Sequence, residues 1–250
     1  MCANDALLLI GHGSARYPDA GRALHRHAET LRLRGQFGQV EAALLNGAPT
    51  VADALARIGA AMIRVVPFFM EDGYFSGVAV PRAIAEVERK ASSRGDTGII
   101  MCPPVGVHDG MAGLIERQAL TLCAESGVAS REAAVLVVGH GSSKSPSRAL
   151  ALHRHSARVA ATELFARVEA AYLEEEPFVA NALHGLRAHP VVVIGFFANH
   201  GGHTVDDLPA LIAAEQAARS DAGRGVRFHG CIADDPAMAE IILDQARHAR

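Results

Sequence analysis

Val137-Val138-Gly139-His140-Gly141-Ser142 brings an apolar run to an abrupt stop at a histidine held between two glycines. A second copy, Leu9-Ile10-Gly11-His12-Gly13-Ser14, lies upstream, and the two histidines are 128 residues apart. The same offset places residues 11–27 on residues 139–155 without a gap, with ten identities in seventeen positions. Self-similarity at one fixed spacing is typical of an internal repeat. The sequence therefore predicts a tandem duplication.

The duplication extends well beyond this segment. The same offset pairs Val40-Glu41-Ala42 with Val168-Glu169-Ala170, Phe68-Phe69 with Phe196-Phe197, and Pro81 with Pro209. A chain of 250 residues then divides into two domains of ordinary size. We expect these domains at residues 1–126 and 130–250, joined by a small and polar linker at 125–132.

Short apolar runs alternate with helical stripes in both halves. The runs that predict strands are 6–10, 40–45, 63–69 and 98–102 in the first half, and 134–138, 168–173, 191–197 and 226–229 in the second. Helical spacing is found at 18–35, from 49 onward, at 81–94 and at 111–123. Alternation of this kind is typical of parallel sheets flanked by helices. The predicted fold class is therefore α/β, with two tandem-duplicated domains, each a small parallel sheet with helices on both faces.

Composition excludes several classes of protein. The formal charge of −3 comes without a basic block, which disfavours nucleic acid as a partner. No apolar run approaches the ~20 residues that span a bilayer, and the N-terminus lacks the pattern of a signal peptide. We therefore expect a cytoplasmic protein with no membrane partner. The four cysteines have no paired spacing, which favours buried free thiols over disulfides or a thiolate zinc site.

Familiar cofactor and nucleophile motifs are missing from the sequence. There is no Gly-x-x-x-x-Gly-Lys-Ser/Thr loop, no dinucleotide fingerprint and no Gly-x-Ser-x-Gly elbow. We therefore expect no organic cofactor.

Metal-binding residue types follow three strands of the second half. His140 follows the first predicted strand, Glu174 the second, and His200 and His203 the third. Ligands of open parallel sheets bind beyond the carboxyl ends of the strands, so these side chains are expected to converge. Imidazole and carboxylate groups suit divalent cobalt, iron, nickel or zinc, and three such ligands leave coordination positions open. The sequence predicts an open metal site here.

The first half serves as an internal control for that site. The offset gives the counterparts as His12 for His140, Asn46 for Glu174, Phe75 for His203 and Asp72 for His200. Only the first histidine is therefore kept unchanged. We expect the principal metal site in the second half, with a degenerate copy in the first where His12 acts as an auxiliary ligand together with Glu71 or Asp72.

Simpler interpretations exist for each of these residues. A Gly-His-Gly segment can be a turn around a histidine with ordinary partners, and Glu174 begins an acidic run, 174–176, that could be a solvated face. The His-Arg-His segments at 25–27 and 153–155 favour packing or surface roles, since residues i and i+2 lie on different faces of a helix. Thr204 and Asp207 form a variant of a capping box, which predicts that His203 lies just ahead of a helix.

Three segments together resemble a known family. They are the strand that runs into Gly-His-Gly-Ser, the segment Ala-Tyr-Leu-Glu at 171–174, and Val-Val-Val-Ile-Gly-Phe-Phe-Ala-Asn-His-Gly-Gly-His-Thr-Val-Asp-Asp-Leu-Pro at 191–209. They resemble the CbiX/SirB class of tetrapyrrole chelatases, which are class II chelatases, and the resemblance spans both repeats. It implies insertion of Co²⁺ or Fe²⁺ into sirohydrochlorin without ATP, for cobalamin or sirohaem synthesis. His140, Glu174 and His203 match the metal-handling positions of that class.

The resemblance also implies roles for individual groups. The macrocycle loses two pyrrole protons as it takes up the metal, so His140 and His203 would be labile neutral ligands and Glu174 a base. Carboxylates of the tetrapyrrole need basic partners, and the candidates are Arg16, Lys144 and Arg148.

Two other functions use the same residues. One is a metal carrier or tetrapyrrole-binding protein without turnover. The other is a phosphoryl-transfer enzyme with His140 as nucleophile, which would need an arginine clamp around the phosphate. Because no arginine adjoins either Gly-His-Gly segment, the phosphoryl-transfer function is disfavoured.

Overall fold

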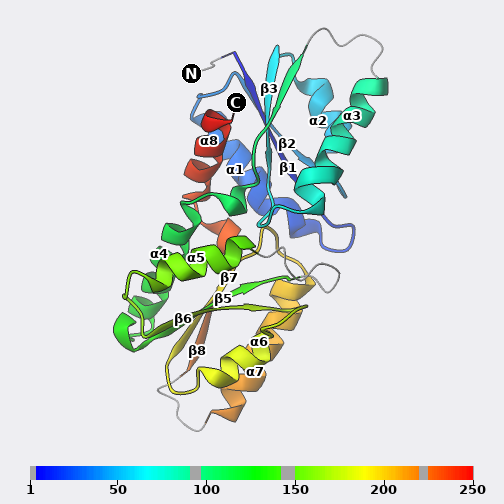
Figure 1. Ribbon diagram of the computed structural model, residues 1–250. Helices are drawn as coiled ribbons and strands as arrows, with labels where there is room; N and C mark the ends of the chain where they lie inside the picture. Colours follow the sequence, from blue (N-terminus) through cyan, green and yellow to red (C-terminus); the bar gives the residue numbers. More distant parts are fainter. Residues whose placement is uncertain (1–3, 91–96, 142–149, 220–224, 250) are drawn as a thin grey trace. The chain divides into compact units, whose positions relative to one another are not determined.

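A computed structural model of the protein describes residues 4–90, 97–141, 150–219 and 225–249 (Figure 1). Within these ranges the strands form two parallel sheets of four, with the orders β2-β1-β3-β4 and β6-β5-β7-β8. The first sheet contains β1 (Ala6–Gly11), β2 (Gln39–Leu44), β3 (Met62–Pro67) and β4 (Gly98–Met101). The second contains β5 (Ala134–Gly139), β6 (Arg167–Tyr172), β7 (Val191–Gly195) and β8 (Val226–Cys231). The predicted fold class is confirmed.

Helices flank both sheets. They are α1 (Arg22–Leu33), α2 (Val51–Arg57), α3 (Val80–Lys90), α4 (Met111–Glu125), α5 (Leu150–Ala160), α6 (Val179–Gly185), α7 (Leu208–Ala218) and α8 (Met238–His248). A π-helical turn leads into α3 and another into α7: η2 (Phe75–Ala79) and η5 (His203–Asp207). Short 3-10 turns are η1 (Pro18–Gly21), η3 (Val105–Val107), η4 (Ser130–Glu132) and η7 (Ile232–Asp234).

The central strands β1 and β5 are buried along their whole length. An unbroken apolar run suits this position, because a parallel strand in the middle of such a sheet is covered on both faces. The register of the central strand with its two neighbours is the same in both repeats. Leu8 of β1 lies opposite Glu41 and Val65, and its counterpart Leu136 lies opposite Glu169 and Val193. The 128-residue offset is thus preserved in the pairing of the first three strands of each sheet.

The chain folds into two compact units whose boundaries differ from those of the sequence repeats. Unit 1 comprises residues 1–108 and 236–250, and unit 2 comprises residues 109–235. Helix α4 therefore follows β4 in the chain but packs with α5, β7 and β8 in unit 2 (Figure 1). Helix α8 follows β8 but packs with α1 and β3 in unit 1. The two repeats have exchanged their closing helices.

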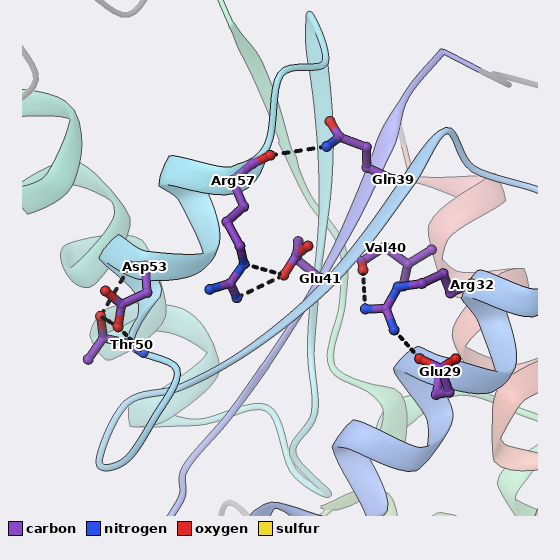
Figure 2. Close-up of polar contacts among 8 residues, drawn as sticks. All are labelled: Glu29, Arg32, Gln39, Val40, Glu41, Thr50, Asp53 and Arg57. Carbon is purple, nitrogen blue, oxygen red and sulfur yellow. Dashed lines mark hydrogen bonds and ion pairs between the residues drawn. The ribbon is translucent and has the colours of Figure 1, made fainter.

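Polar contacts fix the short helix α2 against the edge strand β2 of unit 1 (Figure 2). The helix begins with a capping box, in which Thr50 and Asp53 each accept from the backbone N–H of the other. At its other end the carbonyl of Arg57 accepts from the Gln39 amide at 3.0 Å, and the Arg57 guanidinium pairs with Glu41 at 2.8 Å. A capping bond of this kind contributes about 1 kcal/mol, whereas the exposed ion pair contributes at most about 1 kcal/mol.

The cysteines and the helices agree with what the composition predicts. Cys102, Cys123 and Cys231 are buried free thiols, as predicted, and Cys2 lies outside the described residues. Across the described ranges, no helix has both the length and the apolar character needed to cross a membrane.

Candidate metal centre

Three of the predicted donors converge in unit 2. His140 directly follows β5, Glu174 follows β6 with one residue between them, and His203 is the first residue of the turn η5 after β7. Their ligand atoms all lie within 4.8 Å of one another. Glu174 approaches His140 Nδ1 at 3.8 Å through one carboxylate oxygen and His203 Nε2 at 3.9 Å through the other. They meet because β5, β6 and β7 are neighbouring parallel strands, whose carboxyl ends share one edge of the sheet.

The glycine after each histidine is required by a tight turn. Gly141 has φ +75°, and a Cβ there would lie 2.9 Å from Cβ of Tyr172. Gly13 has φ +72°, and a Cβ there would lie 2.4 Å from the backbone oxygen of Asn46. Only glycine adopts this conformation at low cost with so little space. The turns explain why both repeats keep glycine after the histidine.

Hydrogen bonds at Nδ1 indicate which ring nitrogen is available to bind a metal ion. His140 Nδ1 lies 2.9 Å from the carbonyl oxygen of Gly141, and His203 Nδ1 lies 2.7 Å from the Asp207 carboxylate. Both partners only accept, so Nδ1 carries the proton in each ring and Nε2 is left as the ligand atom. The two rings meet edge-on with centroids 4.4 Å apart.

Asp207 belongs to this site, although the sequence analysis assigned it to a helix cap together with Thr204. That prediction was wrong. Thr204 Oγ1 instead accepts from the N–H of Gly201 at 3.0 Å, and Asp207 accepts from His203. The reason is the wide turn η5, which begins at His203 itself, so that both residues already lie inside the turn. A carboxylate behind a ligand histidine fixes the orientation and the tautomer of the ring.

His200 is not a member of the cluster around His140, contrary to our expectation. Its Nε2 lies 2.5 Å from the carboxylate of Asp234 in η7, and the two residues form a separate group with Cys231. His200 lies in the loop before η5, whereas η7 follows the neighbouring strand β8. The order of the strands therefore directs the two histidines to different partners.

The first repeat keeps the geometry of the site but not its chemistry. His12 Nδ1 lies 2.7 Å from the carbonyl oxygen of Gly13, and the ring meets Phe75 edge-on at 4.5 Å, as His140 meets His203. The amide of Asn46 approaches His12 Nε2 at 3.3 Å. A phenyl ring and an amide thus replace the imidazole and the carboxylate.

The predicted auxiliary partners of His12 are not gathered around it. Asp72 accepts a hydrogen bond from Ser76 at 3.0 Å. Neither Asp72 nor Glu71 joins His12 in any group of three metal donors within the described residues.

Other predicted residues have simpler roles. Glu175 is buried, with 6% of its surface exposed, so residues 174–176 are not a uniformly solvated acidic face. His27 and His155 are buried, and each packs against a phenylalanine, Phe68 or Phe196, with ring centroids 5.9 Å apart. This agrees with a packing role for the repeated His-Arg-His segments.

The predicted basic residues are only partly described. The guanidinium of the exposed Arg16 lies 5.3 Å from the centroid of the Tyr17 ring. Lys144 and Arg148 lie outside the described residues.

Comparison with protein families decides the affiliation of the chain. The family model for CbiX matches residues 6–122 and again residues 134–249, once for each repeat. The chain belongs to the CbiX family. The chain is 26% identical to a probable sirohydrochlorin cobaltochelatase of Halobacterium salinarum, over 98% of this chain and 91% of that protein. It is 35% identical to a sirohydrochlorin cobaltochelatase of Methanocaldococcus jannaschii over 34% of this chain and 61% of that one.

Solved structures share the fold of this CbiX member. A multi-domain protein of Deinococcus radiodurans with structural similarity to chelatases superposes with a TM-score of 0.83 at 25% identity. The match covers 99% of this chain but only 56% of that one. SirB from Bacillus subtilis with Fe³⁺ gives a TM-score of 0.79 at 18% identity, covering 98% of this chain and 94% of that one.

Proposed function

We propose that this protein inserts a divalent metal ion, Co²⁺ or Fe²⁺, into sirohydrochlorin without ATP, as a step of cobalamin or sirohaem synthesis. The observation that carries the proposal is the group of His140, Glu174 and His203 at one sheet edge of a CbiX family chain. The two curated relatives are named as cobaltochelatases, one of them as probable, and solved SirB structures contain Fe³⁺ and cobalt. Cobalt and iron are therefore the metals to compare.

The chemistry begins with the metal substrate bound by Nε2 of His140 and His203. The three side chains are 39–49% exposed, so a metal bound there keeps positions that can be exchanged. Imidazole is a neutral and replaceable ligand for divalent cobalt and iron. Pyrrole nitrogens can therefore replace the histidines as ligands of the metal.

Glu174 is the proposed acceptor for the protons of the macrocycle. Insertion of a divalent ion releases two protons from the pyrrole N–H groups, so the site needs an acceptor beside the metal. The two oxygens of Glu174 lie 3.8 and 3.9 Å from nitrogens of the two histidines. Because the carboxylate is 42% exposed, it can accept each proton in turn and pass it to water.

The alternative function is a metal carrier or tetrapyrrole-binding protein that uses the same residues without turnover. An assay with sirohydrochlorin and Co²⁺ or Fe²⁺ under anaerobic conditions separates the two. A chelatase converts many equivalents of tetrapyrrole per protein, whereas a carrier binds in stoichiometric amounts and stops.

Matched variants from the two repeats test the assignment of residues. We expect His140→Ala and His203→Ala to lower the insertion rate by more than about 100-fold, since loss of a group that only hydrogen-bonds to a metal ligand already costs about 10–100-fold. Variants at the corresponding positions of the first repeat should lower the rate less. Phe75→Ala should leave the rate near that of the wild type, and His12→Ala should cost at most about 2 kcal/mol, or about thirtyfold.

The rates are measured at one metal concentration, after circular dichroism has shown that each variant is folded. Equal losses in His12→Ala and His140→Ala, or a larger loss in His12→Ala, would place the working site in the first repeat instead.

A further inference from the structure

A second group of metal-donor side chains lies in unit 2, apart from the donors of the proposed function. It consists of His200, Cys231 and Asp234, whose ligand atoms lie within 4.8 Å of one another. Cys231 is 1% exposed, while the side chains of His200 and Asp234 are 24% and 28% exposed. Two donors that solvent can reach therefore stand beside one buried sulfur.

The strand that carries the cysteine has a local irregularity. Val193 of β7 pairs with Phe228, but Gly195 pairs with Cys231, so β8 has one extra residue between the two pairs. Gly230 has φ +92°, and a Cβ on Gly195 would lie 2.3 Å from the Gly230 carbonyl oxygen. Bulges of this kind redirect the side chains that follow, often beside functional sites. Here the side chain that follows is Cys231.

The first repeat lacks the donors of this group. Turn η3 and helix α4 begin 127 residues before η7 and α8, so residues beyond β4 correspond to the second repeat at an offset of 127. The counterparts are then Asp72 for His200, Pro104 for Cys231 and Val107 for Asp234, and only Asp72 is a metal-donor residue type. The group is therefore specific to the second repeat and is not a common feature of the two folds.

We propose that His200, Cys231 and Asp234 form a second divalent-cation site, which takes an ion of borderline character such as Co²⁺, Fe²⁺ or Zn²⁺. Thiolate, imidazole and carboxylate together select such ions over Mg²⁺ or Ca²⁺, which prefer oxygen alone. Three protein ligands leave a fourth position for water or another ligand. The site shares no residue with the donors proposed for insertion, so it stands or falls separately from the proposed function.

Binding requires only small movements of the side chains. Ligand atoms at about 2.0–2.3 Å from one tetrahedral ion lie about 3.3–3.7 Å from one another. The 2.5 Å contact between His200 Nε2 and Asp234 must therefore open by about 1 Å. Cys231 Sγ lies 3.4 Å from the carbonyl oxygen of Asn199, and its thiol gives its proton to solvent as the thiolate binds the ion.

Sulfur ligation gives this site its own spectroscopic signature. A Co²⁺ ion bound to thiolate shows a sulfur-to-metal charge-transfer absorption in the near ultraviolet, which histidine and carboxylate ligands do not produce. We expect this band when Co²⁺ is titrated into the full-length reduced protein without tetrapyrrole. The band should persist in the double variant His140→Ala/His203→Ala, because that variant lacks only the other donors.

Variants of the three donors complete the test. Cys231→Ser should abolish the band, and His200→Ala and Asp234→Asn should each weaken the Co²⁺ affinity that the band reports by at least about tenfold. His200 and Asp234 are partly exposed, so their variants are expected to fold even if Cys231→Ser does not.

Other cysteines provide the controls. Cys102 belongs to neither group of three metal donors within the described residues, so Cys102→Ser should leave the band unchanged. Cys2→Ser tests the N-terminal thiol in the same way. The proposal is overturned if the wild type shows no sulfur band at saturating Co²⁺. It is equally overturned if the band survives in Cys231→Ser, or if the Co²⁺ affinity that the band reports is unchanged in His200→Ala.

Discussion

The two repeats differ at few side chains around the candidate metal site. His12 and His140 follow equivalent strands, make the same Nδ1 contact and meet an aromatic ring edge-on at 4.5 and 4.4 Å. The backbone turn is therefore common to both. The group opposite the histidine differs, being Phe75 in one repeat and His203 in the other, so the proposed metal site depends on side chains carried by the same backbone turn.

Asp207 offers a test of positioning at the scale of single residues. Its carboxylate accepts from His203 Nδ1 at 2.7 Å and has no equivalent in the first repeat, where residue 79 is alanine. We expect Asp207→Ala to lower Co²⁺ affinity at the His140 site by about 10–100-fold, because the His203 ring loses the hydrogen bond that orients it. Asp207→Asn should restore much of the affinity, since its amide oxygen still accepts from Nδ1–H.

Calorimetric titration without tetrapyrrole measures this affinity directly. The background is Cys231→Ser, so that the second proposed site does not contribute. Wild-type affinity in a folded Asp207→Ala protein would show that the contact does not position the ligand.

The same residues show which parts of the site a sequence can predict. His140, Glu174 and His203 could be found, because each follows an apolar strand and the parallel order brings strand ends together. Asp207 was misassigned, since Thr-x-x-Asp before a helix also fits a cap. Cys231 was dismissed because its partners come from other elements, which leaves no short Cys spacing in the chain.

Strands and helices follow the sequence closely, but local irregularities do not. The strand predicted at residues 6–10 is observed at Ala6–Gly11, because a continuous apolar run has few alternatives. The π-helical turns η2 and η5 could not be predicted from a 3.6-residue period. They occur 128 residues apart, so this feature predates the divergence of the two sites. The bulge in β8, between Val193 and Gly195 of the neighbouring strand, is another irregularity that the apolar pattern does not predict.

A buried ion-pair network joins the end of α6 to α7 and can be tested at this scale. Glu215 accepts from Arg187 at 2.7 and 2.9 Å and from Arg219 at 3.2 Å. Glu215 and Arg219 are only 8% and 3% exposed. We expect Glu215→Gln to destabilise the protein by about 3–5 kcal/mol, because it leaves the charge of Arg219 buried without its carboxylate.

The loss of stability in Glu215→Gln should be larger at neutral pH than at acidic pH. Hydrogen bonds from Arg187 lower the pKa of Glu215 below its ordinary value. A lowered pKa stabilises the folded protein above the unfolded value of about 4.3, and this contribution is lost as pH falls through the folded pKa. Urea unfolding of the wild type and of Glu215→Gln at pH 7 and near pH 3 measures the difference.

The exposed pair of Glu29 and Arg32 supplies the control, since Glu29→Gln should cost less than about 1 kcal/mol. A pH-independent penalty for Glu215→Gln would exclude the ionic explanation.

At the scale of the whole molecule, the sequence predicts the duplication but cannot assign the closing helices. The repeats suggest domains at 1–126 and 130–250, and the family model matches nearly the same ranges. The compact units nevertheless divide after His108 and Asp235. The apolar stripes of α4 and α8 descend from one ancestral helix, so either stripe suits either sheet. Only the three-dimensional packing shows that they have been exchanged.

This exchange predicts that a mutation in one repeat weakens the sheet of the other. Ile242 of α8 is fully buried, and Leu114 of α4 is 2% exposed. Truncation of such a residue to alanine costs about 2–5 kcal/mol. Ile242→Ala should therefore speed amide hydrogen exchange in β1 and β3, and Leu114→Ala in β5 and β7, because each helix covers the sheet of its own unit.

Native-state hydrogen exchange, read by mass spectrometry on peptides from the four strands, shows which sheet each variant affects. If Ile242→Ala instead loosened β5 and β7 and Leu114→Ala loosened β1 and β3, each helix would belong with the sheet of its own repeat, and the exchange would be wrong.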